Sequence, residues 1–94
     1  MTNYIIKYTT QFKKDYKLAQ RRGLNIPLLD NLIKKLSTGE PLPKEYKDHA
    51  LTGNWVGYRE CHIQPNWLLI YYIHNDNLVL TLSRTGTHSD LFKK

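Results

Sequence analysis

All four histidines lie in the second half of the chain, and three of them, His49, His62 and His88, are candidates for chemistry beside polar or aromatic residues. Histidine is the side chain whose ordinary pKa, about 6.5, allows it to take up or release a proton near neutral pH. Cleavage of RNA without a metal needs such groups, because one removes the proton of the 2′-hydroxyl and another protonates the departing 5′-oxygen. The residues therefore suggest proton transfer on an anionic substrate.

Charged neighbours of these histidines supply the other groups that such a reaction needs. Glu60 is a further proton-transfer candidate, and Arg59 and Arg84 are candidate cations for the charge that develops on the phosphate. If the strands that carry them are neighbours, the pair Glu60 and His62 converges with the pair Arg84 and His88 at one end of a sheet. Any single histidine is more often structural than catalytic, and we interpret His74, next to a turn, as structural.

Two other chemistries are disfavoured by the spacing of the residues. No zinc-binding pattern such as C-x2-C or H-E-x-x-H occurs, and Cys61 and His62 are adjacent, so they point to opposite faces of a strand. Cys61 shares its face with Ile63, which indicates a buried apolar side chain rather than a nucleophile. We expect neither a metal nor another cofactor.

Apolar spacing predicts an α+β domain in the order β-α-α-β-β-β, with two N-terminal helices packed on a small antiparallel sheet. Thr9 or Thr10 suits the start of the first helix, and Gly23 suits its end. The predicted elements are a strand over 4–8, helices over 10–22 and from about 25 to 38, strands over 57–63, 67–73 and 78–83, and a helical turn over 87–92.

Length and composition indicate one domain over 1–94 in a reducing compartment. Cys61 is the single cysteine, so no internal disulfide can form. The N-terminus lacks the apolar stretch of a signal peptide, and the longest apolar run, 67–73, is too short to cross a bilayer. We expect a cytoplasmic protein without membrane contact.

Positive charge is concentrated in the N-terminal third of the chain. Residues 1–36 hold eight basic and two acidic side chains, whereas residues 37–94 hold six of each. Such asymmetry indicates an anionic partner, most often nucleic acid, although a solvated helix face is an equally good explanation of charge alone. The candidate RNA-binding residues are Lys13, Lys14, Lys17, Arg21 and Arg22.

Two runs of residues carry a family resemblance. The run D-H-x-L-x-G-x-W at 48–55 and the run R-x-G-[TS]-H-x-x-L-F at 84–92 resemble the YafQ branch of the RelE superfamily of toxins. The segments 15–19, 57–62 and 65–71 extend the resemblance over essentially the whole chain.

The resemblance implies a RelE-like toxin of a type II toxin–antitoxin pair, which enters the ribosomal A site and cleaves the mRNA codon there. The family's C-terminal catalytic histidine corresponds to His88, which would act as the general acid. The other catalytic residues that the resemblance implies are His49, His62 and Glu60. It also implies that Trp67 and Phe92 bind the substrate.

The same resemblance implies the partners. The basic helices would dock on ribosomal RNA, and an acidic, partly disordered antitoxin of the DinJ type would wrap and silence the toxin. Operator DNA would be bound only through the antitoxin complex, since no helix-turn-helix spacing supports a repressor that acts alone.

Asn66 departs from the family, which usually has Asp before the tryptophan that is Trp67 here. An amide carries no negative charge and accepts no proton at neutral pH. We predict an active enzyme in which Asn66 positions other groups. The alternative is a catalytically weakened module that binds RNA or the antitoxin, and the residues leave open which histidine is the base.

Overall fold

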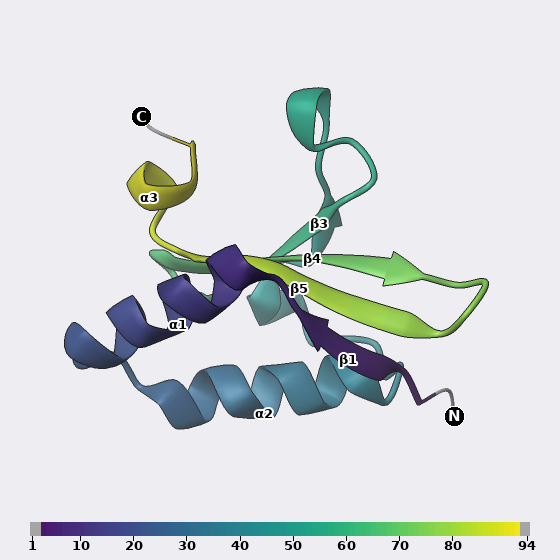
Figure 1. The fold of residues 1–94 in the computed structure, drawn as a ribbon, viewed down its shortest axis with the longest axis horizontal. Coiled ribbons are helices and arrows are strands. Elements are labelled where there is room, and N and C mark those ends of the chain that lie inside the picture. The colour runs from purple at the N-terminus through teal and green to yellow at the C-terminus, as the bar shows by residue number, and fades with distance from the viewer. Residues whose placement is uncertain (1–2, 93–94) are drawn as a thin grey trace.

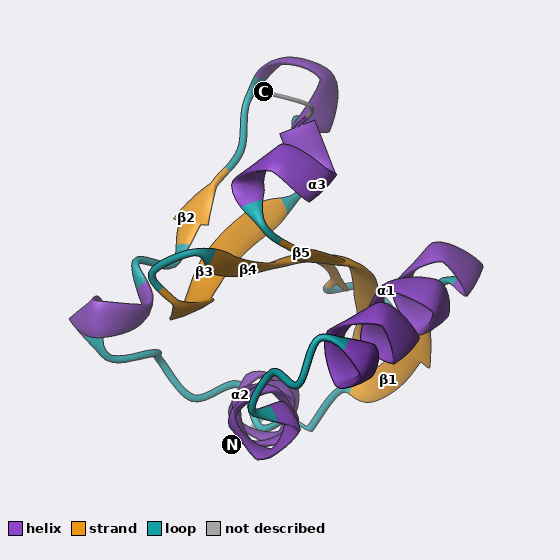
Figure 2. Ribbon diagram, turned by 90° about the vertical axis from the view of Figure 1, so that its left-hand side faces the viewer, coloured by secondary structure: helices purple, strands orange, loops and turns teal. Residues whose placement is uncertain are grey.

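The computed structural model describes residues 3–92, in which two helices cover one face of a five-stranded sheet (Figures 1 and 2). No helix within this range combines the length and apolarity needed to cross a bilayer. The elements are β1 (Ile5–Tyr8), α1 (Thr10–Arg21), α2 (Ile26–Ser37), β2 (His49–Ala50), β3 (Arg59–Gln64), β4 (Trp67–His74), β5 (Val79–Gly86) and α3 (His88–Phe92), with 3₁₀ turns at Lys44–Tyr46 and Gly53–Trp55.

The sheet confirms the α+β class but corrects the predicted layout. Its strand order is β1-β5-β4-β3-β2, and β1 pairs in parallel with β5, so the sheet is mixed rather than antiparallel. Parallel neighbours need a long connection, and here most of the chain separates the two strands. The two-residue strand β2 was not predicted, and β5 runs three residues beyond its expected end at Ser83.

Local sequence explains the helix ends. The Thr9 hydroxyl accepts the N–H of Phe12 at 2.9 Å, which caps α1 as predicted. Gly23 follows α1 with a φ of 74°, a left-handed conformation that glycine adopts without steric cost. Pro27 lies in the first turn of α2, where its missing N–H is not needed.

The main core fills the space between the two helices and one face of the sheet. Its fully buried side chains include Phe12 of α1, Leu29 and Leu32 of α2, and Cys61 of β3. Burial raises the pKa of the Cys61 thiol, which disfavours the thiolate form that a nucleophile needs.

A second, smaller cluster lies on the opposite face of the sheet. Leu68 and Ile70 of β4 pack there against Leu91 of α3. In Figures 1 and 2, α3 and the connection between β2 and β3 rise on this side, away from α1 and α2. The predicted catalytic residues belong to the elements that border this face.

Candidate active site

The buried carboxylate of Glu60 lies between two imidazoles. Glu60 is only 3% exposed, and its Oε1 lies 3.4 Å from Nε2 of His49 and 3.8 Å from Nε2 of His62. The sheet creates this arrangement, because His49 of β2 is the cross-strand partner of Glu60, and His62 follows two residues later on the same face of β3. An imidazole that takes up a proton here gains an ion pair with a carboxylate shielded from water.

The ring of His49 has a defined proton arrangement. Its Nδ1 lies 2.7 Å from the carbonyl oxygen of Lys47. Because a carbonyl only accepts, this contact requires the proton on Nδ1 and leaves the lone pair on Nε2 in the neutral ring. The His49 side chain is half exposed, and its Nε2 is the nitrogen close to Glu60.

His88 lies at the same end of the sheet as His62. His62 is paired with Leu68 and Leu68 with Gly86, so His62 and Gly86 are two strand spacings apart, about 10 Å. His88 follows Gly86 by two residues, is exposed, and begins α3. Its ring centroid is 5.1 Å from that of Phe92 on the next turn. Both residues therefore border the face of the sheet that carries Glu60, His49 and His62.

Aromatic side chains connect α3 to the other side of this face. The ring of Trp55 lies 6.2 Å from Phe92 and 5.3 Å from Tyr58, centroid to centroid, with nearly perpendicular planes in both pairs. The three rings are half-buried over the second hydrophobic cluster, so they pack on it and keep part of their surface exposed.

The two candidate cations are held by carboxylates. Nε and Nη2 of Arg84 each donate to Asp15 at 3.0 Å, and this pairing raises the pKa of Arg84. Nη2 of Arg59 lies 3.3 Å from Asp48, which also accepts the hydroxyl of Tyr71. Their positive charges are thus partly offset within the protein.

Trp67, which was predicted to bind substrate, is buried in the structure. The residue is 2% exposed and belongs to the main core, and its indole N–H donates to the Thr85 hydroxyl at 3.0 Å. The Thr85 hydroxyl in turn donates to the carbonyl of Leu68. No surface remains on Trp67 for stacking on a base. Its neighbour Asn66 is exposed in the β3–β4 turn and makes no side-chain hydrogen bond to any residue within 3–92.

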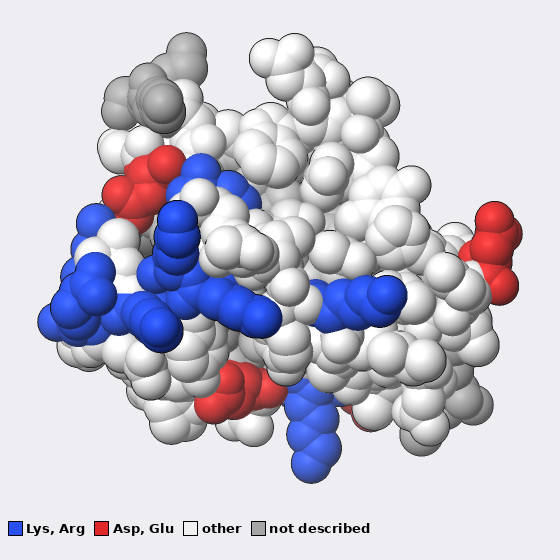
Figure 3. Space-filling view, in the orientation of Figure 1, with Lys and Arg blue, Asp and Glu red and all other residues white. Residues whose placement is uncertain are grey.

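Most of the basic residues predicted to bind RNA form a surface on α1. Lys13, Lys14, Lys17 and Arg21 are exposed, and blue side chains gather over this helix in Figure 3. Arg22 is different, because its guanidinium donates to both carboxylate oxygens of Asp90 on α3, at 2.7 and 3.3 Å. Sequence reasoning did not detect this pair.

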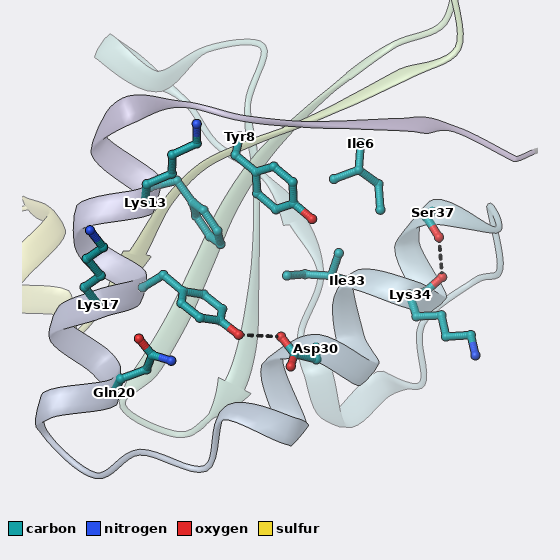
Figure 4. A pocket seen from close by; sticks show the side chains of 11 residues that line it. Ile6, Tyr8, Lys13, Lys17, Gln20, Asp30, Ile33, Lys34 and Ser37 are labelled. Carbon is teal, nitrogen blue, oxygen red and sulfur yellow. Dashed lines mark hydrogen bonds between the residues drawn. The ribbon is translucent and has the colours of Figure 1, made fainter.

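A groove of about 640 Å³ lies between β1, α1 and α2, on the helical side of the sheet (Figure 4). Two of its lining residues are joined by a hydrogen bond, which the hydroxyl of Tyr16 donates to Asp30 at 3.0 Å. The apolar lining residues are Ile6, Tyr8, Phe12 and Ile33, and the basic ones are Lys13, Lys17 and Lys34. The groove thus combines an apolar surface with positive charge.

No group of three or more His, Cys, Asp or Glu side chains within residues 3–92 is arranged to hold a metal ion. The arrangement can carry out proton transfer through His49, and it holds a second imidazole and a buried carboxylate beside it. His88 stands on the other side of the same face. This is a set of groups suited to acid–base chemistry.

Comparison with known proteins assigns the chain to a family. The family model described as "Bacterial toxin of type II toxin-antitoxin system, YafQ" matches residues 4–93. The mRNA interferase toxin YafQ of Escherichia coli K12 is 48% identical over 88 residues, which are 93% of this chain and 94% of the relative.

Two solved structures have nearly the same fold. The E. coli DinJ–YafQ toxin–antitoxin complex contains a chain with 44% identity and a TM-score of 0.87, over 96% of this chain and 98% of that one. A metal-bound toxin from Helicobacter pylori has 39% identity and a TM-score of 0.88, over 98% and 100%. With the family match over almost every residue and the fold in agreement, this chain belongs to the YafQ family of toxins of bacterial type II toxin–antitoxin systems.

Proposed function

We propose that this protein is an mRNA endoribonuclease that cleaves the codon in the ribosomal A site and so stops translation. The observation that carries the proposal is the buried Glu60 carboxylate with two imidazoles against it, on the face of the sheet that His88 also borders. The E. coli relative named mRNA interferase toxin supports the same activity.

His49 is the general base in this proposal. The contact between Nδ1 and the Lys47 carbonyl leaves Nε2 to accept the proton of the 2′-hydroxyl. The new positive charge then lies 3.4 Å from the Glu60 carboxylate, which favours the transfer. Glu60 accordingly orients and stabilises the base, and His62 adds a second polar group that would face the substrate phosphate.

His88 is the general acid, and it protonates the departing 5′-oxygen. Its exposed position at the start of α3 suits a group that must reach a bound RNA chain. Phe92, in ring contact with it, offers an apolar edge to a base. The two bonds from Arg84 to Asp15 use Nε and Nη2 and leave Nη1 for a substrate. We assign Arg84 to stabilising the negative charge that develops on the phosphate. Asn66, exposed in its turn, positions substrate by hydrogen bonding.

Metal independence is part of the proposal and has its own test, because the H. pylori relative is a metal-bound toxin. Toxin dialysed against a chelator and then returned to the magnesium buffer that ribosomes require should keep its full cleavage rate. A loss of activity that zinc or copper restores would contradict the acid–base mechanism.

Two adjoining surfaces, which share Lys13 and Lys17, suggest the partners. Exposed lysines of α1 would contact ribosomal RNA phosphates in the cytoplasm, with an affinity that falls as salt rises. The groove of Figure 4 would bind a segment of an acidic antitoxin that also has apolar side chains. RNA phosphates would make no favourable contact with its apolar lining residues. The DinJ–YafQ complex supports such a partner, and operator DNA would be bound only through that complex.

One observation favours a second candidate. Asn66 replaces the usual acid of the family, and its side chain makes no hydrogen bond within the described residues. A weakened toxin that only binds RNA or its antitoxin would show salt-dependent binding with no cleavage.

Ribosomes programmed with a defined mRNA distinguish the candidates. We expect wild-type protein to cut the A-site codon and His49→Ala to lose at least about 100-fold in rate, the contribution typical of a general base. The control is His74→Ala, which removes an exposed histidine at the far end of β4. Equal cutting of naked RNA would refute ribosome dependence, and unchanged cutting by His49→Ala would refute the assignment of the base.

A further inference from the structure

The helix that carries His88 and Phe92 is only five residues long. A single helical turn is unstable by itself, because helix formation starts with an unfavourable nucleus. Its position must therefore be set by contacts with the rest of the protein. One such contact is apolar, since Leu91 is 6% exposed and packs against β4.

The second contact centres on Asp90. Its Oδ2 accepts the N–H of Thr87 at 2.9 Å, while the Thr87 hydroxyl accepts the N–H of Asp90 at 3.1 Å. This reciprocal pair is a capping box, and it fixes the first turn of α3. The missing side chain of Gly86 leaves room for Asp90, because a Cβ at position 86 would lie 3.0 Å from the Asp90 side chain.

The capping carboxylate is also bound by the C-terminal end of α1. Arg22 donates from both terminal nitrogens to the two oxygens of Asp90, which joins residues 68 positions apart in the chain. Hydrogen bonding from Arg22 is the first cause that lowers the pKa of Asp90, to about 2, so the carboxylate is charged at any pH used for an assay. Bidentate guanidinium–carboxylate pairs fix direction as well as distance.

We propose that Arg22 and Asp90 are positioning residues, which clamp α3 to α1 and so hold His88 at the place where it meets the RNA. The inference rests on the proposed role of His88 in cleavage. It also changes the role of Arg22, which the charge pattern alone assigned to RNA binding.

Arg21 provides a matched control for Arg22. The two residues are adjacent and equally charged, but Arg21 is exposed and has no ion pair within residues 3–92. If both side chains served only to attract RNA, Arg21→Ala and Arg22→Ala would raise KM alike. If Arg22 acts through Asp90, Arg22→Ala lowers kcat by about 5-fold, the loss expected when a solvent-screened ion pair no longer positions a catalytic group, with little effect on KM.

Asp90→Asn separates position from charge. It keeps every positive charge and nearly the same shape, yet it weakens the pair with Arg22. We expect Asp90→Asn to reproduce the kcat loss of Arg22→Ala, and the double variant to be no worse than Arg22→Ala alone, because both changes break one interaction. If the kcat losses of the two single variants multiply in the double variant, the inference is overturned.

A measurement that does not depend on cleavage completes the test. The imidazole signals of His88 in the NMR spectrum of the free toxin should shift or broaden in Arg22→Ala and stay in place in Arg21→Ala. Unchanged His88 signals in Arg22→Ala would refute the clamp. Should His88→Ala cleave normally, the proposed function would fail, while the NMR comparison would still decide whether the pair positions α3.

Discussion

Replacing Asp15 by alanine should destabilise the protein far more than its place on a charged helix suggests. Asp15 is 7% exposed, and its carboxylate accepts two bonds from Arg84 at 3.0 Å and the N–H of Thr85 at 3.2 Å. Removing one partner of a buried ion pair costs about 3–5 kcal/mol. Arg84 keeps about a quarter of its side chain in water, so we expect the lower end, about 3 kcal/mol. For a domain of this size that lowers Tm by about 12–24 °C.

Urea unfolding followed by circular dichroism measures this loss. The midpoint should fall while the slope with denaturant stays the same, since the surface exposed on unfolding does not change. Asp30→Ala is the control, because Asp30 is an exposed carboxylate that accepts one bond, from Tyr16. It should cost less than about 1 kcal/mol. If the two variants differ by less than about 0.5 kcal/mol, within the usual scatter of surface substitutions, the Asp15 network does not hold α1 on β5.

Three further predictions follow from individual contacts. The pKa of Asp90 falls from its ordinary value of 3.8 to about 2 on folding. Its charged form therefore contributes fully to stability above pH 4, and this contribution is lost as pH falls through 2. Because the pair with Arg22 is screened by solvent, the contribution is about 1 kcal/mol. Urea midpoints of Asp90→Asn should therefore depend less on pH between 2 and 4, and an identical pH dependence would contradict this. Cys61 is buried with a raised pKa, so iodoacetamide should label it only on unfolding; rapid labelling of native protein would show the strand to be open. Trp67→Phe removes the bond to Thr85 and should cost about 1 kcal/mol in stability with kcat unchanged, whereas a lower kcat at equal stability would restore Trp67 as a substrate contact.

Local patterns in the sequence predicted the parts of the fold that depend on near neighbours. The cap at Thr9, the end of α1 at Gly23 and the turn at 65–66 all arise within a few residues and match the structure. Alternation along β3 placed Glu60 and His62 on one face, and His49 joined them through the short strand β2.

Contacts between distant residues could not be predicted in the same way. The parallel pairing of β1 with β5 depends on how the two helices return the chain, which no local period encodes. The pair of Arg22 with Asp90 looks, in sequence, like two unrelated surface charges. Trp67 was placed beside the substrate by resemblance, but its strand position buries it under the helices. Burial and pairing are properties of the assembled sheet.

Mapping the 5′ ends of cellular mRNA after induction of the toxin is the most direct test of ribosome-dependent acid–base cleavage. With wild-type protein, we expect new ends within codons of the translated frame. His88→Ala should reduce them by about 100-fold or more, as expected on losing a general acid, and remain folded by circular dichroism. Ends that ignore the reading frame would contradict cleavage in the A site, and ends that persist in folded His88→Ala would contradict the mechanism.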